Sequence, residues 1–496
     1  MGERRISRVV IAGGGTAGWV AAAALVRHLG PLLDITLVES DAIGTVGVGE
    51  STIPTSRSFH GLLGIYEDAF IRATNATFKL GISFENWGQV GDRYFHAFGT
   101  TGRGLWMADF QHLWLAARAQ GFGGDYYDYS LETQAAQAGK FRAGEKEGLS
   151  YAYHLDATAY AKFLRGLAEP AGVKRVEGRI QQVERDGEGG DIAALVLENG
   201  TRVEGDLFID CTGFRALLIE QTLHTGFDDW SHWLATDSAL AVQTVATGPA
   251  VPYTRAIAHR AGWRWRIPLQ HRVGNGLVYS SAFMEEDEAR SLLKAEAEGE
   301  MLFEPRLIRY RTGARKKAWN RNCVALGLAG GFIEPLESTS IHLIKVAVTR
   351  LIQQFPFGGI TQAAIDRYND LSRAEWEHIR DFIILHYHAT RRDDSPFWRR
   401  CREMAVPDTL QQRIALFRET ATAYQAREDL FRSESWVQVL RGQGIEPASY
   451  HRVGHAMPPE QLKQALFDLR SNVSGATAKL PSHEHYLARY AAEEAA

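Results

Sequence analysis

The sequence predicts an α/β protein built around a dinucleotide-binding unit. An apolar strand at 9–12 leads into a glycine-rich turn at 13–18, and an alanine-rich helix to about residue 29 precedes a second strand at 34–39. Alternating strand patterns dominate much of 174–320, whereas helical periodicity prevails from about residue 396. These observations indicate a parallel-sheet core, a β-rich middle and a mostly helical C-terminal region.

Size and composition describe an ordinary globular enzyme. The chain has 496 residues, of which 45% are hydrophobic and 23% charged, enough for a large core and two or more structural modules. A formal net charge of -4 with dispersed charges predicts neither a nucleic-acid partner nor an anionic membrane. The three cysteines are far apart, which favours a reducing compartment and buried thiols.

The start of the chain predicts a cytoplasmic protein. The sequence enters the first strand without a charged leader or a long apolar run. The apolar stretch 19–26 is too short for a bilayer and directly follows the glycine turn. We therefore expect it to be a helix packed on the sheet.

Several later elements are predicted from periodicity. Strands are expected at 176–185 and 192–197, joined by a turn at 186–190, with a return strand at 205–210. Helices are expected at 339–355, 410–427 and 459–470, and the polar stretch 471–479 reads as a loose connection.

The glycine turn carries a complete dinucleotide fingerprint. Gly13 permits a tight turn, Gly15 lets the backbone approach a pyrophosphate, and Gly18 lets the helix pack close to its strand. The amino end of that helix then faces the anion. Glu39, at the end of the second strand, is suited to accept hydrogen bonds from a ribose.

Lys79 is the first candidate for chemistry beyond the cofactor. It lies in the apolar run 77–82, and a buried lysine is rare unless it is paired or used. Burial lowers the pKa of an amine toward neutrality. The alternative is a surface lysine whose stem covers apolar neighbours.

Two further segments draw attention. Glu334 and Glu337 form a carboxylate pair beside the hydroxyl residues 338–340, which read either as an anion site at a helix start or as helix capping alone. The run 263–268 alternates tryptophan and arginine before Ile-Pro, a pattern that often reflects simple core packing of a strand.

Taken together, these motifs resemble the flavin-dependent tryptophan halogenases over roughly residues 5–400. The resemblance implies an FAD-dependent monooxygenase-like core with a glutathione-reductase-type Rossmann fold. It places a discontinuous halogenase core in 1–395, with a substrate-side sheet at about 230–320. Residues 396–496 are then a helical region covering the substrate site.

The resemblance implies FAD, not NAD, as the cofactor. Segments 208–213 and 324–330 look like the two later FAD-contact segments of flavoprotein monooxygenases, and 46–54 looks like the strap over the flavin. The FAD contacts implied are Gly13, Gly15, Thr16, Ala17, Gly18, Glu39, Gly49, Val183, Leu328 and Ile341.

The same resemblance implies a reaction. FADH2 and O2 convert chloride or bromide into hypohalous acid, which Lys79 directs at an indole-type aromatic carbon. Glu337 stabilises the cationic ring and accepts its proton, with Glu334 as the competing candidate. Thr339 and Ser340 stand where the family binds halide; Ser340 replaces the usual glycine and adds a side chain there.

Substrate residues follow in the same way. His96 and Phe98 resemble the pair that sandwiches the indole, and Phe431 is the best match to the family's sandwiching tryptophan, with Trp436 nearby. Trp263 and Trp265 fit the motif that crowds the flavin and disfavours direct oxygen transfer.

The match weakens in the lid. The tyrosine-rich, acidic lid that holds the amino-acid group is not found, because residues 419–435 contain one tyrosine, Tyr424. Indole, a substituted indole and tryptophan all remain candidate substrates.

Alternatives stay open on sequence. A flavin monooxygenase that hydroxylates or epoxidises, or a non-catalytic FAD-binding relative, would share most of these motifs. The lack of an NADH module predicts a separate NAD(P)H-dependent flavin reductase, and the family suggests a homodimer. His386 and His388, with His378 and Asp381 upstream, face different sides of a helix, so no metal site is predicted.

Overall fold

The computed structural model describes residues 5–43, 49–105, 107–144, 148–187 and 190–492. The chain divides into two compact units, each built from three stretches of sequence. The first unit comprises 1–75, 155–234 and 309–377, and the second comprises 76–154, 235–308 and 378–496. Neither unit is continuous in sequence, so residues that act together come from distant segments.

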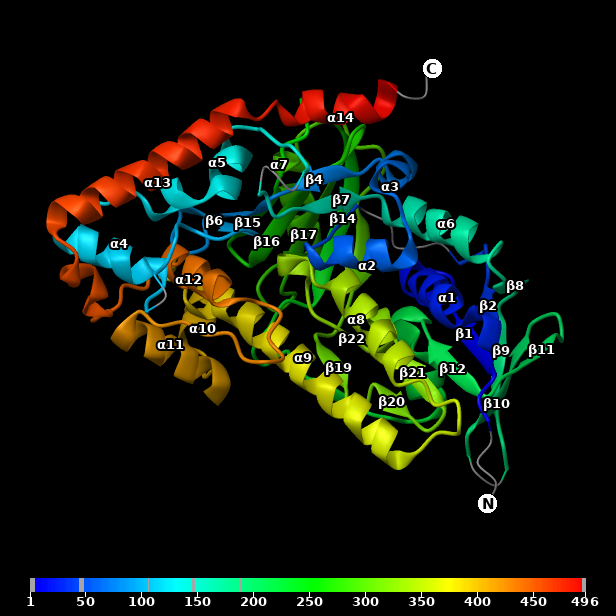
Figure 1. Ribbon diagram of the computed structural model, residues 1–496. Helices are drawn as coiled ribbons and strands as arrows, with labels where there is room; N and C mark the ends of the chain where they lie inside the picture. Colours follow the sequence, from blue (N-terminus) through cyan, green and yellow to red (C-terminus); the bar gives the residue numbers. More distant parts are fainter. Residues whose placement is uncertain (1–4, 44–48, 106, 145–147, 188–189, 493–496) are drawn as a thin grey trace. The chain divides into compact units, whose positions relative to one another are not determined.

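The first unit is organised by a mostly parallel sheet (Figure 1). In the described part of the chain its order is β20-β21-β12-β1-β2-β8. The bounds are β1 (Arg8–Ala12), β2 (Asp34–Glu39), β8 (Lys174–Glu177), β12 (Leu207–Asp210), β20 (Trp319–Asn320) and β21 (Cys323–Ala325). The neighbours from β21 to β8 pair in parallel, and β20 runs antiparallel to β21. The predicted Rossmann-type α/β core is confirmed.

Helix α1 (Thr16–Leu29) covers this sheet. All residues from Gly18 to Val26 are buried, because small alanines let the helix lie close to its neighbours. It packs against α6 (Ala157–Ala168) and α8 (Ser340–Gln353). The apolar stretch at 19–26 is therefore a packed helix, as predicted.

Smaller elements complete the first unit. Two further sheets have the orders β11-β10-β9 and β13-β19-β22 within the described residues. Their strands are β9 (Ile180–Arg185), β10 (Ile192–Leu197), β11 (Arg202–Glu204), β13 (Phe227–Asp229), β19 (Gly313–Arg315) and β22 (Gly331–Phe332). The remaining elements are β3 (Glu50–Ser51), η1 (Gly30–Leu32), α2 (Thr55–Leu63), α3 (Glu67–Thr74), η3 (Gly213–Arg215), η4 (Leu217–Thr222), η5 (Gly327–Ala329) and η6 (Pro335–Glu337).

The predicted single strand at 176–185 is wrong. It divides at Gly178, whose φ of 152° interrupts the extended chain. The part before the glycine, β8, joins the parallel sheet, and the part after it, β9, pairs antiparallel with β10. Because residues 176–185 have a strand-like composition throughout, the sequence did not show that the chain leaves one sheet and enters another.

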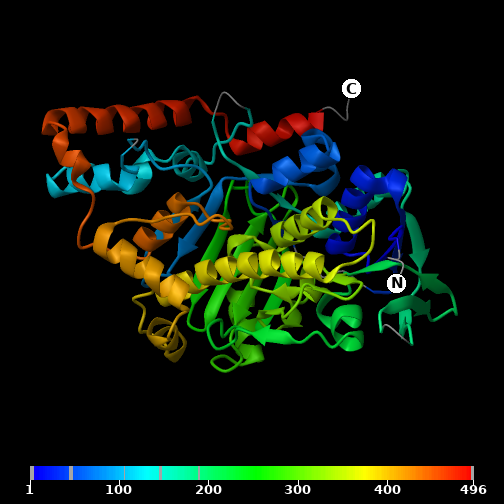
Figure 2. The ribbon, with the colours of Figure 1, turned by 60° about the horizontal axis from the view of Figure 1, so that its bottom comes forward.

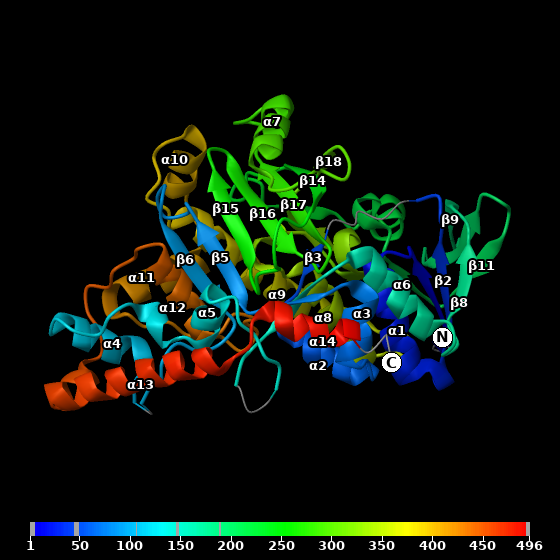
Figure 3. The ribbon, with the colours of Figure 1, turned by 90° about the horizontal axis from the view of Figure 1, so that it is seen from above.

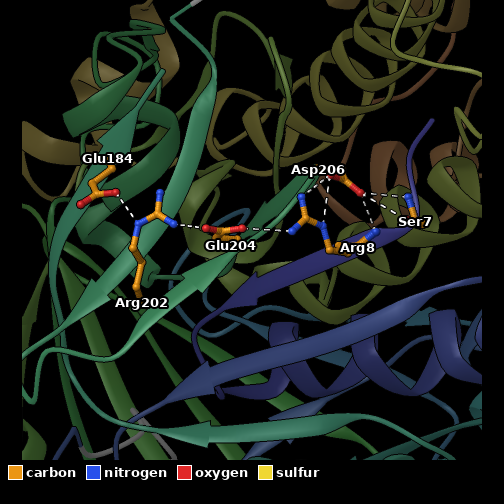
Figure 4. Close-up of polar contacts among 6 residues, drawn as sticks. All are labelled: Ser7, Arg8, Glu184, Arg202, Glu204 and Asp206. Atoms are coloured by element: carbon orange, nitrogen blue, oxygen red, sulfur yellow. Dashed lines mark hydrogen bonds and ion pairs between the residues drawn. The ribbon is translucent and has the colours of Figure 1, made fainter. Parts of the chain in front are cut away.

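A ladder of charges links β9, β11 and the start of β1 (Figure 4). Arg202 lies between Glu184 and Glu204, and Arg8 lies between Glu204 and Asp206. Asp206 Oδ2 also accepts the backbone amides of Ser7 at 3.1 Å and Arg8 at 2.9 Å. Burial of the Asp206 carboxyl opposes ionisation, but its bonds to Arg8 and to these amides outweigh burial and lower its pKa.

Replacing Asp206 with asparagine is expected to destabilise the first unit by about 1–2 kcal/mol, the cost of losing charge-assisted hydrogen bonds. A lowered carboxyl pKa stabilises the fold above the unfolded-state pKa, and this stabilisation is lost as pH falls through the folded-state value. Thermal unfolding from pH 7 to pH 3 should thus show a weaker acid dependence in the variant. An identical acid dependence would contradict the assignment.

The second unit is organised by a long, mostly antiparallel sheet (Figure 3). Its order among described residues is β18-β14-β17-β16-β15-β5-β6. The bounds are β5 (Gly81–Glu85), β6 (Arg93–Ala97), β14 (Ser238–Val245), β15 (Thr254–His259), β16 (Gly262–Pro268), β17 (Arg272–Tyr279) and β18 (Arg306–Arg309). This sheet contains the strands predicted for 230–320 and adds β5 and β6. A short pair, β4 (Thr77–Lys79) and β7 (Ala152–Leu155), runs antiparallel.

Helices of the second unit come mostly from the C-terminal third. They are α4 (Phe110–Ala119), η2 (Tyr126–Tyr129), α5 (Leu131–Gln137), α7 (Glu286–Glu296), α10 (Pro396–Glu403), α11 (Asp408–Thr420), α12 (Ser433–Gly442), η7 (Arg452–Ala456), α13 (Pro459–Lys479) and α14 (His483–Ala492). The long α9 (Gln362–His388), yellow in Figure 2, contributes residues to both units.

Two helix predictions need correction. The helix predicted to reach residue 427 ends at Thr420, because Ala421 adopts a left-handed φ of 60°. The stretch 471–479, predicted as a loose connection, is helical and completes α13. Its polar composition reflects solvent exposure of most of the helix, which leaves few apolar positions to signal periodicity.

All three cysteines are free and buried, as predicted. Among the described helices, none combines the length and apolar character needed to cross a bilayer.

Candidate active site

The glycine turn of the first unit has the predicted geometry. Gly13 has a φ of 108°, and a Cβ there would lie 2.4 Å from the Cys211 carbonyl oxygen. A Cβ on Gly18 would lie 1.9 Å from the carbonyl oxygen of Gly13, so only glycine allows the helix to approach the turn. Gly15 is the N-cap of α1, carries no capping side chain and has open space around it.

This arrangement fits a pyrophosphate. The first amides of α1, at Thr16 and Ala17, have no intrahelical partner, and the helix dipole favours an anion at this end. The second predicted FAD segment lies beside them, since a Cβ on Gly327 would come 2.8 Å from the Ala17 Cβ. Leu328 follows in η5, and Ile341 lies buried in the first turn of α8.

The Glu39 carboxylate binds several side chains that the sequence did not indicate. Its carboxylate pairs with Arg175 at 2.6 Å and Arg165 at 3.6 Å and accepts a hydrogen bond from the Trp19 indole at 3.3 Å. These partners fix its carboxylate beside the turn, where a Cβ on Gly14 would collide with it. A ribose would therefore share Glu39 with Arg175.

Other predicted cofactor segments have defined local roles. Asp210, at the end of β12, accepts the amides of Thr212, Leu218 and Ile219 and so shapes the following turn. Val183 packs, half-buried, against the apolar core of the first unit. Gly49 has a φ of 88°, whereas residues 46–48 of the predicted strap lie outside the described residues.

The carboxylate pair lies just before α8. Glu334 precedes the short η6 and Glu337 is its last residue, and they are 0% and 1% exposed. Ser338 then adopts a left-handed conformation with φ 61°, which reverses the chain into the helix. Both carboxylates are thus buried within the first unit, and this geometry does not choose between them.

The capping alternative for 338–340 is not what the structure shows. Thr339 is the N-cap of α8, but no side chain caps the helix, and Thr339 Oγ1 has no hydrogen-bond partner among the described residues. Thr339 is 1% exposed, so this hydroxyl and the open amides of the first turn are donors shielded from water, and we call them the anion cradle. Halide binding there stays a prediction. Ser340 opens the helix and contributes one of those amides.

Two hydrogen bonds connect the Ser338 turn with the predicted strap segment, and α8 with the start of α2. Ser338 Oγ donates to Ser51 Oγ at 3.1 Å, and Thr55 Oγ1 lies 3.0 Å from His342 Nδ1. Beside Ser51, burial raises the pKa of Glu50 to about 7. Sequence reasoning assigned no role to Glu50, although its place in the strap motif was a usable signal.

Lys345 is a second buried lysine that the sequence analysis missed. It is 3% exposed, its Nζ has no hydrogen-bond partner among the described residues, and it lies over the rings of Phe59 at 5.3 Å and Tyr160 at 5.7 Å. Burial lowers its pKa to about 7. Its spacing of four residues after Ile341 and three before Val348 places it on the apolar face of α8, a signal that was not used.

Lys345→Met is expected to stabilise the protein by about 3 kcal/mol at pH 7, because it removes the cost of burying an ionisable amine. Since the folded-state pKa is lowered, wild-type stability falls as pH decreases from about 10.5 to about 7 and then levels off. The gain should shrink at pH 10. Thermal unfolding at both pH values measures it, with Lys345→Arg as a destabilising contrast; equal gains at both pH values would refute this.

In the second unit, Lys79 ends the short strand β4 and is 0% exposed. Its Nζ lies 5.0 Å from the centre of the Phe98 ring. Neighbouring backbone groups fix the strand: Leu80 donates to the Pro252 carbonyl at 2.8 Å, and Phe98 donates to the Leu80 carbonyl at 3.0 Å. The surface alternative for Lys79 is therefore wrong, because the strand is buried throughout.

His154 is a neighbour of Lys79 that sequence reasoning did not find. It pairs with Thr77 at 3.0 Å and Thr254 at 2.9 Å. Burial, reinforced by the charge of Lys79, holds the His154 pKa well below its usual value. A neutral imidazole beside the lysine avoids a second positive charge; only the folded pairing of β4 with β7 reveals it.

Among the predicted aromatic residues, Phe98 lies beside Lys79, and His96 lies near Phe431. His96 lies in β6 and Phe98 directly follows that strand, and the His96 ring lies 6.2 Å from Phe431. Phe431 stacks on Phe382 with ring centres 3.8 Å apart. The structure thus brings Lys79 to Phe98 and His96 to Phe431.

Trp263 and Trp265 lie in β16 and are 1% and 8% exposed. Their rings are 6.1 Å apart, and Trp265 covers Gly276 so closely that a Cβ there would lie 2.0 Å from the ring. These tryptophans therefore serve core packing of the second unit's sheet. A flavin-gating role remains a prediction.

The histidines considered as metal ligands have separate partners. His386 Nδ1 meets the Tyr94 hydroxyl at 2.9 Å, and His378 pairs with Asp429 at 3.0 Å. Throughout the residues that the structure describes, no three His, Cys, Asp or Glu side chains are grouped to hold a metal ion.

A Rossmann-type core with an FAD-compatible glycine turn, together with a buried lysine beside an aromatic ring, fits the class of flavin-dependent oxidative enzymes. The family model for tryptophan halogenases matches residues 8–459. The chain therefore belongs to the tryptophan halogenase family and is a flavin-dependent halogenase.

Individual relatives agree over nearly the whole chain. This chain is 34% identical to the tryptophan 7-halogenase of Lentzea aerocolonigenes, over 97% of this chain and 98% of that protein. A flavin-dependent halogenase from Xanthomonas campestris has 55% identity and a TM-score of 0.97, with 98% and 99% of the two chains covered. A second, from Brevundimonas sp. BAL3, has 44% identity and a TM-score of 0.94, again covering 98% and 99%.

Proposed function

We propose that this halogenase uses FADH2, O2 and chloride or bromide to halogenate an indole-type aromatic, with Lys79 delivering the oxidised halogen. The observation that carries the proposal is the full burial of Lys79 beside Phe98, with neutral His154 near it. A lysine amine so placed is available for chemistry, and the resemblance to the halogenases distinguishes Lys79 from the other buried lysine, Lys345.

Bound reduced flavin, with O2 and halide, supplies the oxidised halogen. The residues that would hold it are the glycine turn with the open amides of α1, and Glu39 for the ribose. The anion cradle at Thr339 and Ser340 would hold the halide, where backbone N–H groups and the Thr339 hydroxyl can donate.

Lys79 would hold the electrophilic halogen at a fixed direction from the aromatic ring. Phe98, with its backbone fixed to Leu80, provides a flat apolar wall next to the amine. Exclusion of water protects a reactive halogen from hydrolysis, and a buried strand supplies that exclusion. Lys79 would position the halogen, and Phe98, His96 and Phe431 would position the ring.

Glu337 is our choice for the base. Electrophilic substitution places positive charge on the ring and then releases a proton, which a carboxylate can stabilise and accept. Glu337 is directly followed by the Ser338 turn into the halide cradle, whereas Glu334 lies on the other side of Pro335. A base in this segment would act close to the anion site.

Substrate and partners complete the proposal. The relatives named above include a tryptophan 7-halogenase, and we propose indole or a substituted indole as the preferred substrate because the lid segment 419–435 lacks tyrosine-rich anchoring. A separate NAD(P)H-dependent reductase would supply FADH2. Three free, buried cysteines are in keeping with a reducing cytoplasm.

The test is product mass spectrometry with FAD, NADH, a flavin reductase and air. Indole and tryptophan are compared, each with chloride, with bromide and without halide. The proposal expects a halide-dependent chlorine or bromine isotope pattern, with more product from indole than from tryptophan. No halogenated product from either substrate would refute it.

A further inference from the structure

Asp429 anchors the segment that precedes Phe431. Its side chain is 2% exposed and lies 2.5 Å from Arg413 Nη2 and 3.0 Å from His378 Nδ1. The Ala426 amide also donates to it at 2.8 Å. We call Arg413, Asp429 and His378 the latch.

The latch connects three elements of the second unit, α9, α11 and the segment after α11. Arg413, on α11, contacts the rings of Tyr424 at 4.2 Å and Trp436 at 4.4 Å. It also donates to the Tyr424 carbonyl at 2.9 Å. The guanidinium therefore fixes the segment at both Tyr424 and Asp429.

Phe431 follows the latch by two residues and stacks on Phe382 of α9. Phe382 is one helical turn after His378, so the latch and the stack use the same face of α9. Trp436 meets Phe382 edge-on at 4.9 Å, and so contacts both the stack and Arg413. The latch and the Phe431 ring are thus joined through shared neighbours on α9 and α12.

Charges in the latch are matched. The hydrogen bond and charge of Asp429 raise the pKa of His378. Burial opposes ionisation of Asp429, but His378, the Ala426 amide and Arg413 outweigh it and lower the Asp429 pKa. The Asp429 charge is already matched by Arg413 and His378, so a substrate ammonium group would have to compete with two cations for it.

We propose that the latch positions Phe431 as a preformed wall of the aromatic site, so that the substrate is selected by its ring face and not by an amino-acid group. This inference rests on the proposed function and specifies its substrate class as indoles without a zwitterionic side chain. Arg413, Asp429 and His378 act through Phe431 and are positioning residues.

The test separates KM from kcat for indole halogenation. Asp429→Asn is expected to raise KM by about fivefold to tenfold, the scale of one aromatic contact, with kcat within about twofold. Asp394→Asn is the matched control, because Asp394 pairs with Arg392 at 2.7 Å in the same unit and contacts none of the latch. It should leave KM unchanged.

A double-mutant cycle distinguishes positioning from general loosening. Asp429→Asn should have little further effect on KM in the Phe431→Ala background, since the ring through which it acts is gone. Full additivity, or an equal KM rise in Asp394→Asn, would overturn the proposal. Where Asp429→Asn fails to fold, His378→Asn keeps the Arg413 pair and should show a smaller KM rise of the same kind; an unchanged KM would overturn it.

The wild-type control separates this inference from the proposed function. If wild type gives no halogenated indole, the proposed function fails. If wild type halogenates indole and the variants keep its KM, only the latch fails. Preference of wild type for tryptophan over indole would overturn the substrate class.

Discussion

Lys79→Met is expected to abolish halogenated indole, lowering product formation by about a thousandfold or more while reduced flavin is still consumed. Methionine fills the buried volume but has no amine to hold an electrophilic halogen. Lys79 is 0% exposed, so an amine dissolved in the solvent cannot reach its position and replace it. Product mass spectrometry and the flavin oxidation rate, measured in one reaction, report both quantities.

A matched control is Lys345→Met, which removes the other buried lysine described above. It should keep halogenation while raising stability. Circular dichroism and FAD binding should be unchanged in Lys79→Met. Retention of more than a tenth of the product in Lys79→Met would contradict the assigned role.

Glu337→Gln is expected to lower kcat by about a hundredfold, the usual scale of a general base. Glutamine preserves size and hydrogen bonding but carries no charge, so it neither stabilises a cationic ring nor accepts its proton. Glu334→Gln is the paired comparison, because Glu334 is equally buried in the same segment. Single-turnover product formation with indole measures the chemical step in both.

Assigning the base to Glu337 or to Glu334 predicts different outcomes for the two variants. A large loss in Glu337→Gln with near-normal turnover in Glu334→Gln supports the assignment. The reverse pattern would transfer the role to Glu334, and similar small losses would remove both from the chemistry.

Local patterns were sufficient for much of the fold. The first βαβ unit follows from a strand, a glycine turn and an alanine-rich helix, each specified by adjacent residues, and β10 was predicted with its observed bounds. The start of α8 was also readable, since it depends on a turn and a helix that are neighbours in sequence, whereas halide binding there stays a prediction.

Features that depend on distant partners were not readable. Glu39 meets Arg175, His154 meets Thr77, and Asp429 meets His378 only after long stretches of chain fold together. Burial of Lys345 likewise depends on the packing of α2 and α6 around α8. The end of α11 was missed because Ala421 takes a left-handed conformation without a glycine to mark it.

The most direct test of the central claim is the mass spectrum of the wild-type indole product formed under oxygen-18 gas with bromide. Halogenation predicts the bromine doublet with no oxygen-18 in the product, because the oxygen leaves as water. A product that carries oxygen-18 and lacks bromine would show direct oxygen transfer to the ring and contradict the halogenase account.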